Sequence, residues 1–354
     1  LAGADRYETS VAVARQFVAA ARAAGAPPTA VIVASGESLV DALSAVTLAA
    51  ALGAPVVLTR AGTLPPSVRA FLAENPFSRV VVIGGTAAVS PAVEAALAAA
   101  AAVVERIAGA DRFATATAIA RRAGIAGDWC DSNQRAAVLV NGSRFADAVV
   151  IAPLAYALNL PVLLTDADAL PAETARYLAD AGIERVVVVG GTAAVSTTTA
   201  AATVAAGVSG ITRLAGADRY ETSVEVVRAI GGCGVEQRDP DSVAFVNGTA
   251  TADGVVAGPL LGLGLGGNGV TPILLVDADE IPSAVRRWLV TGWPATTSGV
   301  VIIREIVPVG GTAVVSDAVV TTAQLLVGPR PQKDEPRQSG AAGGSSPART
   351  GPVV

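Results

Sequence analysis

The sequence predicts an α/β protein made of three copies of one small Rossmann- or Toprim-like module, each a parallel sheet between two layers of helices. Two observations lead to this prediction. Three sequence blocks recur in the same order three times along the 354 residues. Between the blocks, short runs of Val, Ile and Leu alternate with Ala-rich segments of helical periodicity. This alternation is typical of buried parallel strands connected by helices, and the recurrence indicates tandem modules.

The first block predicts the start of a helix. It reads L-A-G-A-D-R-Y-E-T-S or a close variant, and it occupies Leu1–Ser10, Ile107–Ala116 and Leu214–Ser223. Its aspartates, Asp5, Asp111 and Asp218, are suited to cap the helix, because a side-chain oxygen at this position accepts hydrogen bonds from free backbone amides. Glu8 and Glu221 follow three residues later, which matches a capping box.

The second and third blocks each follow a predicted strand. The second carries an Asp in the first turn of a helix, and it occupies Val31–Leu43, Val138–Val149 and Ala244–Val255. The third begins with a Gly pair, and it occupies Ile83–Ser90, Val189–Ser196 and Val309–Ser316. Both blocks therefore lie at the carboxyl ends of parallel strands, where open α/β sheets bind ligands.

Within the first copy the predicted elements follow one another in strict alternation. We expect helices over Asp5–Ala24, Ser38–Leu52, Pro65–Glu74 and Ser90–Ala102, and strands over Thr29–Ala34, Pro55–Leu58 and Arg79–Ile83. Ser90 is a suitable N-cap for the last helix, and Pro91 follows at the first helical position.

Two further short strands suggest how the modules join. Val103–Ile107 and Gly210–Leu214 precede the second and third copies of the first block, whereas the first copy has no such lead-in. Ala323–Val327 lies at roughly the matching distance after the third copy. We expect it to supply the missing strand to the first module and to close the modules into a ring with approximate threefold symmetry.

The repeat predicts modules over residues 1–105, 106–212 and 213–328. The third module is longer, and its extra residues around Gly262–Gly269 and Ala295–Arg304 are expected to form surface loops. Residues 329–354 are rich in Pro, Gly, Ser and charge, which predicts a disordered tail or linker. Because the chain contains no Met, we expect an N-terminal segment outside this sequence.

Composition excludes several classes of function. The net charge of −5 and the lack of a basic stripe argue against nucleic-acid binding. The chain has no His, so a His-ligated zinc centre and a His general base are excluded, and we predict no metal and no cofactor. Ala148–Thr165 is apolar, but Pro153 and Pro161 interrupt it, so we predict no membrane span.

Two cysteines, Cys130 and Cys233, leave the redox compartment open. We expect two independent thiols, and the alternative is a single disulfide formed in an oxidising compartment.

The three ordered blocks resemble those of the cell wall binding repeat 2 family over about Leu1–Gly328. The resemblance rests on the G-A-D-R-Y-E-T-type opening, the D-A-L-type helix start and the G-G-T-A-A-V-S-type closing block. It implies a secreted or surface protein of a Gram-positive-type bacterium, associated with the cell wall or surface layer. Two departures, Phe113 and Ala114 in the second copy and Gly254 in the third, imply that the modules are not equivalent.

The candidate ligand-binding residues are the Arg of the first block, the Asp of the second and the Gly pair of the third. An Arg can pair with a phosphate or carboxylate, and backbone amides near a Gly turn can surround an anion. Each also has a structural alternative: an internal ion pair for Arg, a favourable place at a helix N-terminus for Asp, and a tight turn for Gly. The candidates are Arg6, Asp41, Gly84, Gly85, Arg112, Asp147, Gly190, Gly191, Arg219, Asp253, Gly310 and Gly311.

The resemblance implies noncovalent binding to a cell-wall polysaccharide or teichoic-acid-like polymer, and we expect no catalytic residues. It also implies that the triplet anchors a surface protein and accompanies a fused effector domain outside the binding repeats. Two alternatives remain at this point: a cell-wall hydrolase or its modifier, and a nucleotide-binding α/β protein. The lack of a catalytic constellation weighs against the first, and the lack of a G-x-G-x-x-G fingerprint weighs against the second.

Overall fold

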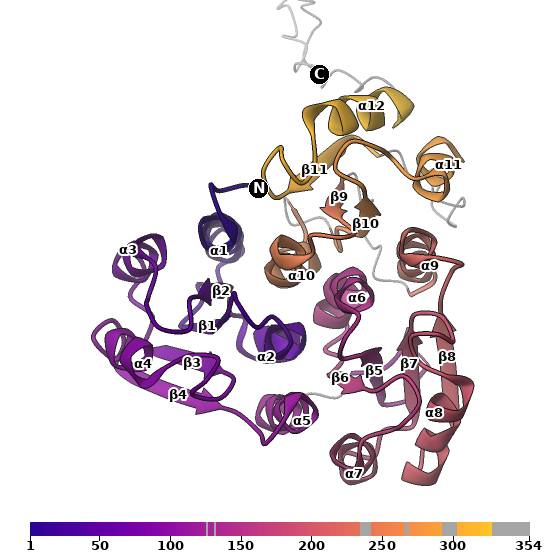
Figure 1. Ribbon diagram of the computed structural model, residues 1–354, viewed down its shortest axis with the longest axis horizontal. Coiled ribbons are helices and arrows are strands. Elements are labelled where there is room, and N and C mark those ends of the chain that lie inside the picture. The colour runs from indigo at the N-terminus through magenta and orange to yellow at the C-terminus, as the bar shows by residue number, and fades with distance from the viewer. Residues whose placement is uncertain (125–126, 131, 234–241, 266–268, 292–302, 328–354) are drawn as a thin grey trace, which may run out of the picture.

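The computed structural model describes residues 1–124, 127–130, 132–233, 242–265, 269–291 and 303–327 (Figure 1). The first repeat contains α1 (Arg6–Ala23), β1 (Ala30–Ser35), the 3-10 helix η1 (Asp41–Ser44), α2 (Ala45–Leu52), β2 (Val56–Thr59), α3 (Pro66–Glu74), β3 (Arg79–Ile83), α4 (Pro91–Ala98) and β4 (Val103–Ile107). These elements lie close to the predicted ranges, because the Val-rich runs and the caps that define them are local signals.

The other two repeats follow the same alternation of helices and strands, except that the described residues of the third include no fourth strand. The second contains α5 (Arg112–Ala123), β5 (Ala136–Asn141), α6 (Phe145–Ala157), β6 (Val162–Thr165), α7 (Ala172–Asp180), β7 (Arg185–Val189), α8 (Thr197–Ala202), η2 (Thr203–Ala206) and β8 (Gly210–Leu214). The third contains α9 (Arg219–Gly232), β9 (Ser242–Asn247), α10 (Ala252–Leu263), β10 (Ile273–Val276), α11 (Ser283–Thr291), β11 (Glu305–Val309) and α12 (Asp317–Val327).

Each repeat has its own parallel sheet. The strand orders are β2-β1-β3-β4, β6-β5-β7-β8 and β10-β9-β11, and every pairing between these strands is parallel. The central strands β1, β5 and β9 are buried along their whole length, as expected for strands covered on both faces. The predicted fold class is therefore confirmed.

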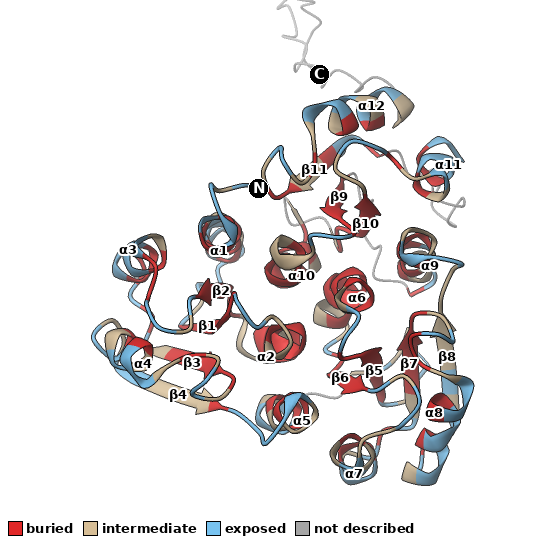
Figure 2. Ribbon diagram, viewed as in Figure 1, coloured by how far each residue is buried: buried red, intermediate tan, exposed pale blue. Residues whose placement is uncertain are grey.

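The three repeats surround a common centre. Helices α2, α6 and α10 lie together in the middle of the ring, and they are largely buried (Figures 1 and 2). One continuous apolar cluster includes Leu48 of α2, Leu154 of α6 and Leu260 of α10, each with no exposed surface. The core therefore passes through all three repeats, so the ring is a single packed unit.

The ring closes in a different way from the one predicted. Ala323–Val327 is part of helix α12, so the prediction that it forms a strand of the first module is wrong. Its Ala323 is fully buried and Val319 of the same helix is nearly so, as in an amphipathic helix packed on its own repeat.

Leu1 takes the place at the edge of the third sheet that lead-in strands take in the other two. The Gly310 amide donates to the Leu1 carbonyl at 2.8 Å, and the Leu1 amino nitrogen donates to the Pro308 carbonyl at 2.8 Å. In the first two sheets, the corresponding bonds join Gly84 to Ile107 and Gly190 to Leu214, both at 2.9 Å. Each lead-in strand thus belongs to the sheet of the preceding repeat, and the start of the chain follows the same rule.

A stripe of three glycines brings α10 close to α6. A Cβ added to Gly254 would lie 2.7 Å from Cγ1 of Val149, and one added to Gly258 would lie 2.6 Å from Cβ of Ala152. A Cβ on Gly262 would lie 2.6 Å from the Pro153 carbonyl oxygen. These contacts explain why Gly254 replaces the Ala of the other repeats. Gly262 was expected in a surface loop, and this is wrong because it belongs to α10.

A disulfide joins the second and third repeats. Cys130 and Cys233 are bonded, with their Cα atoms 4.1 Å apart, so the prediction of two independent thiols is wrong. The sequence alone leaves this pairing open because the two residues are separated by 103 positions, and only the packing of one repeat on the next brings them together.

Several expectations fall on other parts of the chain. Residues 266–268, residues 295–302 of the third module and the predicted tail at 329–354 lie outside the described residues. Within the described ranges, no helix combines the length and the apolar character needed to cross a membrane.

Candidate functional site

Residues from adjacent repeats lie close together where one repeat packs against the next. At each junction, the second-block Asp and third-block Gly pair of one repeat face the first-block Arg of the next. We call these places the 1/2, 2/3 and 3/1 junctions. Their central residues are Asp41 and Arg112 in the first, Asp147 and Arg219 in the second, and Asp253 and Arg6 in the third.

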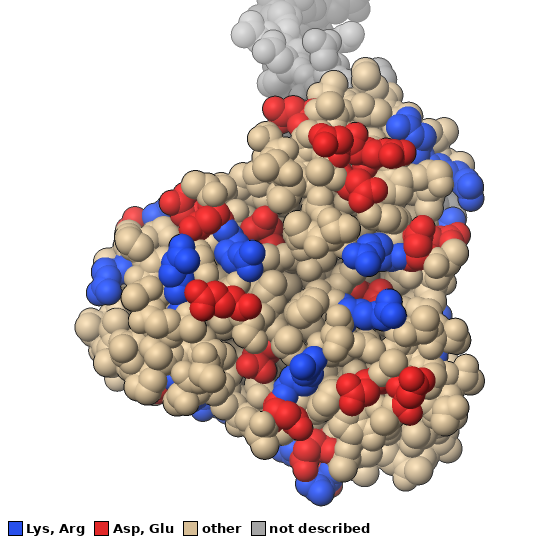
Figure 3. Space-filling model, in the orientation of Figure 1, with Lys and Arg blue, Asp and Glu red and all other residues tan. Residues whose placement is uncertain are grey.

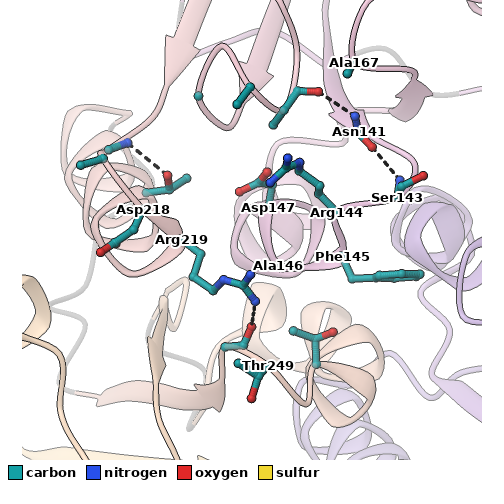
Figure 4. Close-up of a pocket in the computed structure, with 18 of the residues that line it drawn as sticks. Asn141, Ser143, Arg144, Phe145, Ala146, Asp147, Ala167, Asp218, Arg219 and Thr249 are labelled. Atoms are coloured by element: carbon teal, nitrogen blue, oxygen red, sulfur yellow. Dashed lines mark hydrogen bonds between the residues drawn. The ribbon is translucent and has the colours of Figure 1, made fainter.

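The 2/3 junction is a cleft of about 880 Å³ (Figure 4). Asp147, Gly191 and Arg219 line it together with Arg144, Asp166 and Asp218. The 3/1 junction is a smaller cleft of about 390 Å³, lined by Arg6, Asp253 and Gly311 among others. Thus the structure brings together the candidate residue types that the sequence analysis listed separately, and it draws them from neighbouring repeats.

The first-block aspartates are helix caps. Oδ1 of Asp5 accepts hydrogen bonds from the backbone amides of Tyr7 and Glu8, both at 2.9 Å. Asp111 and Asp218 cap α5 and α9 in the same way, at 2.8 Å. These bonds satisfy amides that a helix start otherwise leaves free, so the predicted structural role of the aspartates is confirmed.

The first-block arginines hold the loop after the first strand of their own repeat. Nη1 of Arg6 donates to the Gly36 carbonyl at 2.7 Å, and Nη1 of Arg219 donates to the Gly248 carbonyl. Arg112 donates to the Gly142 carbonyl and to Oγ of Ser143, both at 3.1 Å. Because a guanidinium has five N–H donors, each of these arginines keeps donors for a ligand after positioning the loop.

The first glycine of each third-block pair leaves room for the second-block carboxylate of its own repeat. Gly190 has φ +108°, a value that favours glycine, and a Cβ added there would lie 2.5 Å from Oδ2 of Asp147. The same arrangement recurs at the other junctions, in Gly84 with Asp41 and in Gly310 with Asp253. The second glycines, Gly191 and Gly311, instead approach the first-block backbone of the next repeat.

Asparagines connect the second block to the third. Nδ2 of Asn141 donates to the Ala194 carbonyl at 2.7 Å, and its Oδ1 accepts from the Ser143 amide at 2.7 Å (Figure 4). Asn247 does the same in the third repeat, with Val314 and Thr249. Ser35 stands here in the first repeat, and its hydroxyl accepts from the Glu37 and Ser38 amides. The side chains thus fix the turns that carry the junction residues.

Burial raises the pKa of the carboxyl group at every junction, in Asp41, Asp147 and Asp253. The effect is largest for Asp147, which is 7% exposed and whose pKa rises to about 6, although the charges of Arg144 and Arg219 oppose the shift. A buried carboxylate with a raised pKa destabilises the folded state once it ionises.

Asp147→Asn is therefore expected to stabilise the protein in a pH-dependent way. Because the folded state holds the proton more tightly, the contribution of Asp147 to stability is fully present below the unfolded pKa of about 3.9 and is lost as the pH rises to about 6. The substitution should raise the free energy of unfolding by about 2–3 kcal/mol at neutral pH and change it little at pH ~4.

Urea unfolding at both pH values checks this expectation, with Asp168→Asn, an exposed aspartate of the same repeat, as control. An equal effect of Asp147→Asn at the two pH values would contradict it.

Each junction also holds a first-block threonine. The hydroxyls of Thr9, Thr115 and Thr222 accept from the backbone amides of Gly3, Gly109 and Gly216 at 3.0–3.1 Å. Thr115 and Thr9 also partly oppose the rise in the pKa of Asp41 and Asp253, whereas no threonine opposes that of Asp147. These threonines were not among the sequence candidates, although the T of each G-A-D-R-x-x-T block marks them.

Arg144 was also missed by the sequence analysis. It lines the 2/3 cleft, it is exposed, and its charge acts on Asp147. Ser38 and Ala250 stand at the equivalent positions of the other repeats, three residues before the second-block Asp. The signal that marks Arg144 is therefore a departure from the repeat, whereas the candidates were chosen because they recur.

The face that carries the junctions is chemically mixed. Basic and acidic side chains lie side by side on this face, and large uncharged areas separate the clusters of charged residues (Figure 3). Among the described residues, no group of three or more Cys, Asp or Glu side chains is arranged to hold a metal ion. Ser90 and Ser196 accept hydrogen bonds from amides of the helices that they cap. The arrangement offers charged donors and acceptors to a polar ligand.

A family model described as cell wall binding domain 2 (CWB2) matches the chain three times, over residues 1–94, 106–200 and 213–320. The three matches coincide with the three repeats of the structure, and together they cover most of the sequence.

Two curated proteins of Bacillus subtilis (strain 168) are similar in sequence. The chain is 32% identical to N-acetylmuramoyl-L-alanine amidase LytC over 228 residues, which are 64% of this chain and 42% of the amidase. It is 30% identical to an amidase enhancer over 285 residues, which are 80% of this chain and 35% of the enhancer. The chain thus spans less than half the length of either relative.

Two solved structures from Clostridium difficile share the fold. Cwp6 aligns with a TM-score of 0.76 and 24% identity, covering 93% of this chain and 48% of Cwp6. Cwp8 aligns with a TM-score of 0.70 and 22% identity, covering 92% of this chain and 51% of Cwp8.

Proposed function

Because this chain belongs to the cell wall binding domain 2 family, we propose that its three repeats anchor a surface protein through the junctions between them. Membership makes the chain a secreted, wall-associated unit that binds cell-wall polymer.

One observation supports the junctions as binding sites. At the 2/3 cleft, charged side chains of two repeats converge at the carboxyl ends of parallel strands, where α/β folds bind ligands. Arginine is suited to phosphate and carboxylate groups because its N–H donors form paired hydrogen bonds with them. We therefore propose an anionic wall polymer, such as a teichoic-acid-like chain or an acidic polysaccharide.

The repetition of the site favours binding by avidity. A polymer offers the same chemical unit many times, so occupation of one junction raises the effective concentration of polymer at the others. Modest affinity at each junction is then sufficient for firm anchoring. We keep the predicted modules, residues 1–105, 106–212 and 213–328 followed by a tail or linker at 329–354, as part of this proposal.

We propose that the chain itself catalyses no reaction. LytC is named as an amidase, but the chain spans only 42% of it, so any hydrolysis is assigned to a fused effector domain outside the chain. The other alternative, nucleotide binding, has less support, since the Gly pairs do not form a G-x-G-x-x-G fingerprint.

Retention on deproteinised Gram-positive cell walls tests the proposal. The protein should sediment with the walls, soluble wall polymer should release it, and the walls should release no new reducing ends or free amino groups. Failure to sediment would overturn the binding proposal, and wall turnover by the purified chain would overturn the assignment as a non-enzyme.

The first-block arginines should contribute jointly to retention. Single substitutions Arg6→Ala, Arg112→Ala and Arg219→Ala are expected to weaken wall binding by a fewfold each, whereas the triple variant should lose most of it, because avidity depends on several occupied sites. Sedimentation with walls measures this, and circular dichroism verifies that each variant is folded. Full retention of a folded triple variant would exclude these arginines.

A further inference from the structure

The three junctions are unequal in a way that points to a principal site. The 2/3 cleft has more than twice the volume of the 3/1 cleft, at about 880 Å³ against about 390 Å³. It alone contains a second-block arginine, since Arg144 corresponds to Ser38 and Ala250 in the other repeats. The 2/3 and 3/1 clefts therefore differ in both volume and charge, although the repeats share one fold.

Arg144 is available to a ligand. Its side chain is exposed, and its guanidinium donates to no carbonyl or side chain in the described ranges. It occupies the N-cap position of α6 without capping that helix by its side chain, so the positive end of the helix dipole also faces the cleft. Arg219 adds a second guanidinium from the next repeat, with one donor used on Gly248 (Figure 4).

Asp147 provides an acceptor in the same cleft. The Asp147 carboxylate lines the 2/3 cleft and forms no hydrogen bond with any described residue, whereas Asp253 lines the smaller 3/1 cleft. A buried carboxylate without a protein donor costs folding free energy, and a ligand hydroxyl would satisfy it. Two other carboxylates, Asp166 and Asp218, line the cleft as well, and Oδ1 of Asp218 is already held by the Glu221 amide.

We propose that the 2/3 cleft is the principal polymer site and that it takes a glycosyl unit bearing an anionic group. Arg144 and Arg219 hold the acidic group, and Asp147 accepts a hydrogen bond from a sugar hydroxyl. The 1/2 and 3/1 junctions then bind further units of the same polymer more weakly. This inference rests on the proposed wall binding and adds to it the main site and the class of ligand unit.

Arg144→Gln tests the proposal, because it removes one exposed charge that no described hydrogen bond needs. Affinity for solubilised wall fragments, measured by calorimetry, should fall about tenfold or more, as expected for loss of a charge-assisted hydrogen bond. Arg69→Gln is the matched control: Arg69 is exposed on α3, away from the junctions, and its loss should leave the affinity unchanged. Arg144→Lys should retain part of the binding.

Transfer of the arginine gives a test in the opposite direction. Ala250 is exposed in the 3/1 cleft at the position equivalent to Arg144. Ala250→Arg in the Arg144→Gln background should restore much of the lost affinity if the arginine, and not only the size of the cleft, determines binding. No recovery would show that the arginine binds only in the setting of the larger 2/3 cleft, whereas full recovery to wild-type affinity would overturn the choice of that cleft as the principal site.

The outcomes separate this inference from the general function. If wild-type protein fails to bind walls, the proposed function fails. If it binds but Arg144→Gln and Arg69→Gln are equal, only the principal site is wrong. Walls stripped of phosphodiester-linked polymer and reduced at their carboxyl groups provide the ligand control, because undiminished binding to them would exclude an anionic unit.

Discussion

Alanine in place of both Cys130 and Cys233 is expected to lower the free energy of unfolding by about 2–5 kcal/mol. The disulfide connects residues 103 positions apart, and a crosslink that closes a long loop restricts the unfolded chain strongly. Alanine is chosen because Cys233 is only 3% exposed, so serine would add the separate cost of a buried hydroxyl.

Guanidinium unfolding measures the change, and wild-type protein treated with a reductant is the control. The reduced wild type and the alanine pair should have similar midpoints, both well below that of the oxidised protein. Coincident curves for oxidised and reduced protein would contradict the expectation. Since the bond joins the second and third repeats, its loss should also increase hydrogen exchange at the 2/3 junction more than at the 1/2 junction.

Gly258→Leu is expected to destabilise the ring by about 3 kcal/mol or more, at the upper end of overpacking substitutions. Even a Cβ at this position would lie 2.6 Å from Cβ of Ala152, so α10 must move away from α6. These helices belong to the continuous central core, so movement at this contact affects all three repeats.

Thermal unfolding checks this prediction, and Gly232→Leu is a matched control. Gly232 is exposed at the end of α9, and nothing lies within 4 Å of an added Cβ. Leucine there should be neutral or slightly stabilising, because it is a better helix former than glycine. Equal effects of the two substitutions would show that the close approach of α10 and α6 has no energetic importance.

Much of the fold is predictable because its signals are local. The caps at Asp5 and Ser90, the Val-rich strands and the recurrence of three blocks lead to the correct elements and to three parallel-sheet modules. The helices and strands of each module are determined by residues within that module, and the caps act over only three or four residues.

The contacts between modules are less predictable. Ala323–Val327 was expected to be a strand from its distance along the chain, but its apolar residues fit a helix face, and Leu1 takes the edge position instead. The Cys130–Cys233 pairing and the fit of Gly258 on α6 depend on how neighbouring repeats pack. The repeat pattern predicts the fold of one module, but it does not predict which surfaces of neighbouring modules pack together.

The candidate site shows the same division. The structure places the Arg, Asp and Gly candidates close together, but the sequence did not indicate that Asp147 faces Arg219 of the following repeat. The repeat pattern does not mark Arg144, because only one of the three copies has an arginine at this position. Their roles in binding stay predictions until wall affinity is measured.

The closed ring has a consequence for stoichiometry. An open row of three units has two interfaces, whereas a cycle of three has three, and the contact of Leu1 with Pro308 and Gly310 belongs to the last one. A fourth unit added in tandem would find every neighbouring position taken. Greater valency would therefore require a second complete cycle, so adhesive strength in proteins of this design should increase in steps of three.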